Sequence, residues 1–197
     1  MIVTQDDETI DQILSSVESI CKKYPEKYWL ELDKTQSYPT EFVKSMTESG
    51  HLNALIPTKY GGAGLSLLIA ARILEKIHQS GCNAAAAHAQ MYTMGSILKY
   101  GSEAQKSKWL PLIAKGEVRL QAFGVSEPEA GTDTSSISTT AIRKENKYIL
   151  NGQKIWTSRA LHSDLMILLA KTKSKNERNS KSDGLSLFLI DIRESLG

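Results

Sequence analysis

The sequence predicts an α+β protein, in which an all-α helical domain over residues 1–120 is followed by an antiparallel β domain over residues 121–197. Up to Leu120, apolar residues recur at helical spacing between capping residues and glycine stop signals. Beyond Leu120, short segments rich in isoleucine, threonine, tyrosine and tryptophan are separated by turn residues, which is typical of strands. A chain of 197 residues is long enough for one or two domains with a sizeable core.

Helices in the first domain are indicated by apolar stripes and by end signals. The first has one apolar face that ends at Cys21, and the second starts at Pro39, which suits a first helical turn. Ser102 and Gln105 have capping-box spacing, and Gly50 can close a helix with a left-handed cap. The helices are expected over residues 10–21, 39–50, 67–80, 83–101 and 102–116.

Strands in the second domain are expected over residues 137–144, 147–158, 165–172 and 184–191. Glu145-Asn146 makes a tight connection between the first two, and Asn151-Gly152 places a turn or bulge in the second. The chain stops at "ESLG" directly after the last strand, although a finished β domain covers its edge strands. We therefore expect the β domain to be incomplete at its C-terminal end.

Composition and charge exclude several classes of protein. With 24 basic and 22 acidic residues, the net charge of +2 gives no electrostatic footprint for nucleic acid. Cys21 and Cys82 lie far apart without zinc-ligand spacing, which indicates core residues in a reduced compartment rather than a metal site or a disulfide framework. There is no apolar run of membrane-spanning length, and the start "MIVTQDDETIDQ" is acidic where a targeting peptide is basic. These features favour a cytoplasmic protein.

The stretch "FGVSEPEAGTDTSS", beginning at Phe123, lies where the two predicted domains join, and ligand sites often form at such places. It can also be a simple connector, because Pro128 and Gly131 favour turns and the hydroxyl residues and Asp133 can cap the backbone. The residues by themselves leave both interpretations open.

Several motifs in order resemble the acyl-CoA dehydrogenase family. "AFGVSEPEAGTD", followed after one hairpin by "NGQKIWTS", is similar to the paired flavin-binding motifs of that family. "IPTKYGGAGLS", "YGSEAQKSKWLPLIAKGE" and "GLSLFLID" resemble it in the same order, so that the likeness runs from about Pro39 onward. The resemblance implies an N-terminal helical domain, a middle β domain and a C-terminal helical bundle, of which this chain supplies the first and most of the second.

The resemblance also implies a site for FAD and for an acyl-CoA substrate. Trp156 covers one face of the flavin ring, and the Ser158 hydroxyl lies near flavin N5. Gly131 and Thr132 contact the CoA part of the substrate, with Thr132 standing where relatives have serine. The residues implied for the cofactor are Phe123, Val125, Ser126, Trp156, Thr157 and Ser158.

The function implied is dehydrogenation of an acyl-CoA across its α and β carbons to the 2-enoyl-CoA, with an electron-transferring flavoprotein as acceptor and a homotetramer or dimer as the assembly. In relatives the C-terminal bundle contributes the catalytic glutamate, so no catalytic residue is assigned here and the chain alone is expected to be inactive. Related flavin oxidases or monooxygenases and a non-catalytic remnant of the fold are the alternatives. The acyl chain length stays open.

Three titratable residues are candidates for a local base. Glu127 and Glu129 are interpreted as solvated or capping carboxylates, because the junction loop gives neither a fixed position. His88 on an alanine-rich helix is interpreted as a packing or surface residue. The nearby Gln90, Met91 and Met94 can either line an acyl pocket or fill the core.

Overall fold

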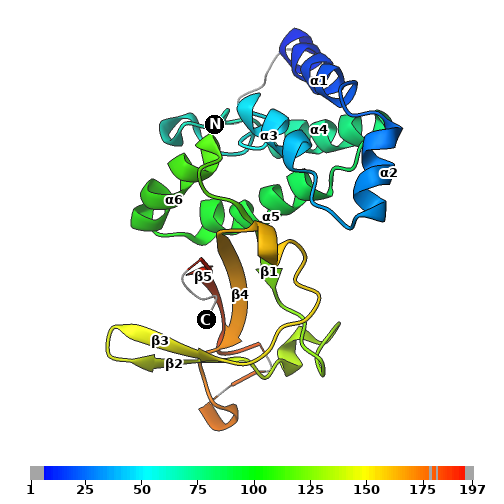
Figure 1. Cartoon of the computed structure of the whole chain (residues 1–197). Helices are drawn as coiled ribbons and strands as arrows, with labels where there is room; N and C mark the ends of the chain where they lie inside the picture. The colour runs from blue at the N-terminus through cyan, green and yellow to red at the C-terminus, as the bar shows by residue number, and fades with distance from the viewer. Residues whose placement is uncertain (1–6, 178, 181, 194–197) are drawn as a thin grey trace. The chain divides into compact units, whose positions relative to one another are not determined.

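The computed structural model describes residues 7–177, 179–180 and 182–193. The chain divides into two compact units, one over residues 1–120 and the other over residues 121–197 (Figure 1). The first is helical and the second is built on a sheet, which confirms the predicted fold class. In the described part of the chain, none of the helices combines the length and the apolar character needed to cross a lipid bilayer.

The helical unit contains one helix that the sequence pattern did not predict. This helix, α2, has no fully buried residue, and its Tyr28 and Trp29 side chains pack against the core only partly buried. The helices of the described residues are α1 (Asp7–Cys21), α2 (Glu26–Lys34), α3 (Thr40–Glu48), α4 (Leu67–Gln79), α5 (Ala85–Tyr100) and α6 (Glu103–Lys115).

Local signals fix the helix ends as predicted. Ser102 Oγ accepts a hydrogen bond from Gln105 N at 3.2 Å, and Gln105 Oε1 accepts one from Ser102 N at 2.9 Å, which completes the capping box of α6. Gly116 ends the same helix in the left-handed region, with φ of 76°. Gly50, after α3, has φ of 78°.

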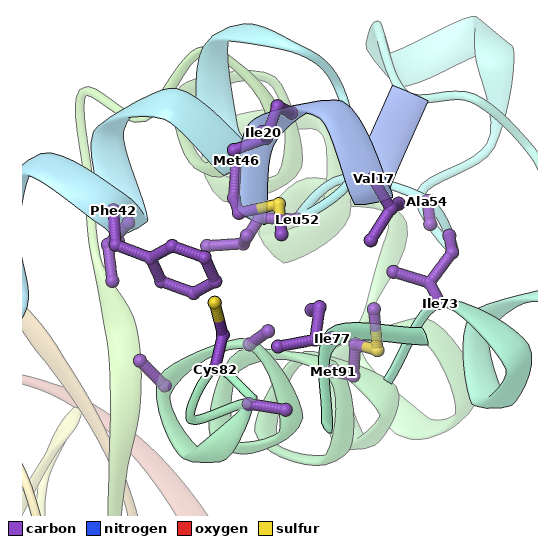
Figure 2. Close-up of a cluster of buried hydrophobic side chains, with 14 of the residues drawn as sticks. Val17, Ile20, Phe42, Met46, Leu52, Ala54, Ile73, Ile77, Cys82 and Met91 are labelled. Atoms are coloured by element: carbon purple, nitrogen blue, oxygen red, sulfur yellow. The ribbon is translucent and has the colours of Figure 1, made fainter. Parts of the chain in front are cut away.

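The core of the helical unit gathers apolar side chains from α1, α3, α4 and α5 (Figure 2). Both cysteines are free thiols and lie in this cluster, as expected for core residues. Burial, and secondly the neighbouring Cys82, raises the pKa of the Cys21 thiol to about 12, so this thiol stays protonated and unreactive at neutral pH. Labelled members of the cluster include Val17, Ile20, Phe42, Met46, Leu52, Ile73, Ile77, Cys82 and Met91.

Replacing Ile77 by alanine is expected to destabilise the helical unit by about 2–5 kcal/mol, because Ile77 is fully buried and its truncation leaves a cavity. Leu68→Ala on the same helix is the matched control, since the Leu68 side chain is 70% exposed. Urea unfolding of both variants checks the prediction. Equal losses of stability would contradict it.

Stability of the helical unit should fall as the pH drops below about 6.5 because of His51. This residue is buried, its Nε2 lies 3.1 Å from Ser16 Oγ, and burial lowers the pKa of its imidazole below 6.5. The unfolded chain therefore binds a proton at a higher pH than the folded chain does. The His51 contribution is fully present above the unfolded pKa and is lost as the pH falls toward the folded one.

Urea unfolding between pH 8 and 5.5 tests the assignment to His51. His51→Gln should flatten the pH dependence in this window, because glutamine does not titrate. A variant with the same slope as the unaltered chain would show that other groups cause it.

In the described part of the sheet unit, five strands form a mixed sheet whose order is β1-β4-β2-β3, with β5 also pairing with β4. β2 with β3, and β4 with β5, are antiparallel as predicted, whereas β2 and β4 meet in parallel at the single pair Thr140–Lys171. The strands are β1 (Leu120–Gly124), β2 (Thr140–Lys144), β3 (Lys147–Asn151), β4 (Leu165–Lys171) and β5 (Leu185–Asp191).

Two strand predictions need correction. β1 was not predicted, because four of its five residues are buried and it lacks the alternation of a half-buried strand. The second predicted strand, residues 147–158, ends at Asn151, where the chain turns at Gly152. A Cβ at Gly152 would lie 2.6 Å from Thr139 Cα, so the backbones approach too closely there for another residue.

The expected open end at "ESLG" comprises residues 194–197, which lie outside the described residues.

Candidate functional site

Two loops of the sheet unit lie side by side. The first, residues 125–133, follows β1, and the second, residues 152–159, follows β3 (Figure 1). Ile155 N donates to Ser126 O at 2.9 Å, and Lys154 Nζ donates to Val125 O at 2.9 Å. The structure thus brings Val125 and Ser126 beside the segment that carries Trp156, Thr157 and Ser158.

The first loop is a stabilised turn. Glu127 and Ala130 exchange two backbone hydrogen bonds, of 2.9 and 3.1 Å, around Pro128 and Glu129. Asp133 then caps the short 3₁₀ turn η2 (Thr134–Ser136) by accepting from Ser135 N at 3.1 Å. The turn and the cap expected of a connector are therefore present. Their hydrogen bonds do not involve Val125 and Ser126, the first two residues of the loop.

Glu127 is buried and ion-paired, so of the two expected alternatives the solvated carboxylate is wrong, whereas its bonds to backbone N–H groups agree with the capping one. Its side chain is 3% exposed and lies 2.8 Å from Lys154 Nζ, whose side chain is 8% exposed. It also accepts hydrogen bonds from the backbone N–H and hydroxyl groups of Ser138 and Thr139. Glu129, by contrast, lies on the exposed turn.

The ionisation of Glu127 follows from these contacts. Burial raises the pKa of its carboxyl, but the hydrogen bond from Lys154 and the donors at Ser138 and Thr139 outweigh burial and hold the pKa well below its usual range. A carboxylate that is already fully paired and so weakly basic cannot take a proton from a substrate carbon at neutral pH.

Trp156 has the most unusual position of the predicted site residues. Its backbone is left-handed, with φ of 58°, and its side chain is 86% exposed. Trp156 is therefore not a half-buried residue of the strand predicted over residues 147–158. A bulky residue rarely adopts this backbone region, and such strained residues cluster at ligand sites. The exposed indole offers a flat apolar surface on which a planar ring can stack.

The other predicted site residues differ in burial and in their place in the sheet unit. Phe123 is half-buried on β1, and Thr157 and Ser158 follow Trp156 directly. Gly131 and Thr132 are exposed on the first loop beyond the Glu127–Ala130 turn.

The residue types fit the isoalloxazine ring of a flavin, which has two apolar faces and one polar edge. Trp156 supplies an apolar wall. Within the described part of the chain, the hydroxyls of Ser126, Thr157 and Ser158 have no hydrogen-bond partner, so they can serve a polar edge.

Residues of α5 belong to the helical unit itself. Met91 packs in its core, and Gln90 donates to Leu52 O at 3.4 Å and accepts from Arg119. His88 is exposed, with its ring 5.1 Å from that of Tyr92. The structure therefore favours the core alternative for Met91 and the surface alternative for His88.

Lys154 is the residue that sequence reasoning missed. It lies in the "NGQKIWTS" motif, but its partner Glu127 is 27 residues away along the chain. The available signal was the one basic residue of the second motif and the three acidic residues of the first, in two motifs that the resemblance already placed together.

Comparison with known proteins supports this interpretation of both units. Residues 7–117 match the family model described as "Acyl-CoA dehydrogenase, N-terminal domain", and residues 122–197 match "Acyl-CoA dehydrogenase, middle domain". The chain is 36% identical to a glutaryl-CoA dehydrogenase of Desulfococcus multivorans, over 84% of the chain and 42% of that protein. It is 34% identical to an acyl-CoA dehydrogenase of Bacillus subtilis, over 81% of the chain and 41% of that protein.

Solved structures show the same likeness. An acyl-CoA dehydrogenase from Geobacillus kaustophilus matches with a TM-score of 0.84 and 27% identity, covering 97% of this chain and 50% of that one. A chain in the structure of the electron transferring flavoprotein of Acidaminococcus fermentans matches with a TM-score of 0.83 and 28% identity, covering 97% and 49%.

The chain spans 41–42% of the length of these curated relatives and about half of the solved chains. The two family models together cover nearly all of its residues, in the order that the family requires. The chain therefore belongs to the acyl-CoA dehydrogenase family, of which it comprises the N-terminal and middle domains.

Proposed function

We propose that this chain is the FAD-binding part of an acyl-CoA dehydrogenase that converts an acyl-CoA thioester to its 2-enoyl-CoA. The observation that carries the proposal is the exposed, left-handed Trp156 beside the Val125–Ser126 loop, in a chain of this family. Homologous dehydrogenases acting on other thioesters, such as the glutaryl-CoA dehydrogenase of Desulfococcus multivorans, support the class of reaction and leave the acyl group open.

Each of the predicted site residues named below then has a role. Trp156 packs against one face of the flavin ring, and the other face is left for substrate. Ser126, Thr157 and Ser158 hold the polar edge, Phe123 contributes an aromatic contact, and Gly131 and Thr132 contact the CoA portion. Bound FAD supplies the acceptor for the hydride that leaves the β carbon.

The proton of the α carbon needs a base, and neither glutamate of the first loop suits this role in the structure of the described residues. Glu127 is ionised and paired with Lys154, and Glu129 stands on an exposed turn. We place the base in a C-terminal helical domain of the whole enzyme, together with part of the substrate site. An electron-transferring flavoprotein as electron acceptor, a homo-oligomeric assembly and a cytoplasmic location complete the proposal.

FAD binding is the first test. The polypeptide as its gene encodes it, purified and reconstituted with FAD, is expected to be yellow and to show flavin absorption bands. Trp156→Ala should weaken FAD binding by about 1 kcal/mol or more, because it removes a stacking wall. Leu161→Ala is the matched control, since Leu161 is also a large apolar side chain in this region and is 88% exposed.

Absence of flavin bands after reconstitution would contradict the proposal. Equal FAD affinity of the Trp156 and Leu161 variants would remove Trp156 from the site. Failure on every acyl-CoA thioester together with rapid oxygen consumption on another substrate would assign the protein to the oxidase or monooxygenase alternative.

A further inference from the structure

We propose that Lys154 and Glu127 form a positioning pair that holds the two loops of the site in register with each other. The inference rests on the proposed function, in which these loops bind FAD. Neither side chain is assigned to contact the flavin, since both are buried and paired with each other.

The Lys154 ammonium bridges two points of the first loop. It donates to Val125 O at 2.9 Å and to Glu127 Oε1 at 2.8 Å, on either side of Ser126. The next residue of the second loop, Ile155, donates its N–H to Ser126 O at 2.9 Å. Three consecutive residues of one loop are therefore tied to two consecutive residues of the other, immediately before Trp156.

Glu127 extends this connection to the sheet. It accepts hydrogen bonds from Ser138 and Thr139, which directly precede β2. Thr139 O in turn accepts from Lys171 N of β4 at 2.8 Å. The pair thus links both loops to strands of the sheet, and these strands provide a rigid support.

The backbone of Trp156 explains why such a support matters. A left-handed conformation at a bulky residue persists only where the surroundings impose it. The bonds of Lys154 and Ile155 fix the chain just before this residue. The pair therefore sets the position of the indole relative to Ser126 before a ligand arrives, which lowers the ordering cost of binding.

The test compares Lys154→Met and the double variant Glu127→Gln/Lys154→Met with the control Lys173→Met, all in the polypeptide as its gene encodes it. Lys173 forms an ion pair with Asp183 in the same unit, but its side chain is 45% exposed. The double variant leaves no uncompensated charge buried, so it answers the question if Lys154→Met fails to fold. Three readouts are needed: FAD affinity, the visible circular dichroism of bound flavin at saturation, and amide hydrogen exchange.

We expect the double variant to bind FAD at least tenfold more weakly and to alter the visible circular dichroism of the flavin that it still binds. Exchange of the Ile155 amide should accelerate at least tenfold, whereas that of Leu168, within β4, should not change. Lys173→Met should match the unaltered protein in all three readouts.

The contrary outcomes separate this inference from the proposed function. If the unaltered protein binds no FAD, the proposed function fails and the inference fails with it. If it binds FAD and the double variant binds equally well with an unchanged flavin spectrum, only the positioning role is overturned, whatever the exchange rates. Loss of the fold in both Lys154 variants, with the control intact, would show that the pair acts on stability alone.

Discussion

Residues 1–197 alone, saturated with FAD and given acyl-CoA thioesters of several lengths, are expected to show no dehydrogenase turnover above a buffer blank. Removal of the α proton must accompany departure of the hydride, and the proposed function places the base for it outside these residues. Glu127 is the one buried acid among the residues that the structure describes, and its pKa is held well below the usual range. Loss of a general base typically costs about 10²–10⁴ in rate. The part of the substrate site that we place in a C-terminal domain is also outside residues 1–197.

An assay with an artificial electron acceptor measures this, with a family member that includes a C-terminal domain as the positive control. Turnover well above the blank would contradict the prediction. The base would then be sought at Glu129 and His88 by replacing each with glutamine, since both side chains are exposed.

Replacing Lys154 by alanine is expected to destabilise the sheet unit by about 3–5 kcal/mol, because the Glu127 carboxylate is then buried without its cation. Lys173→Ala should cost less than about 1 kcal/mol, since its ion pair with Asp183 is largely open to solvent. Urea unfolding of the two variants makes the comparison. Similar losses of stability in the two variants would show that the buried ion pair contributes no more than the more exposed one.

The pH dependence provides an independent check on the same pair. Because the folded pKa of Glu127 is depressed, its contribution to stability is present above the unfolded value of about 4.5 and is lost as the pH falls below it. Glu127→Gln/Lys154→Met should therefore lose less stability between pH 5 and pH 3 than the unaltered chain. An identical acid dependence would contradict the depressed pKa.

Local patterns were sufficient to predict most of the fold. The capping box of Ser102 and Gln105 and the tight connection at Glu145-Asn146 involve neighbours in sequence, so the residues that specify them are visible together. α2 and β1 were missed for the opposite reason. β1 is buried on nearly all of its length, so it lacks the alternation of a half-buried strand. α2 meets the core only through partly buried side chains such as Tyr28 and Trp29, and these contacts form only when the helical unit folds.

The sequence by itself determined the two-part organisation, the motifs and the chemical types in the candidate site, because these depend on residue identity and spacing. It could not determine that Glu127 pairs with Lys154, that Trp156 leaves the strand with its ring exposed, or that the second loop bonds to the first at Ser126. These features arise from contacts between segments 27 or more residues apart. Only the folded sheet brings such segments together, and burial then decides which charges must be paired.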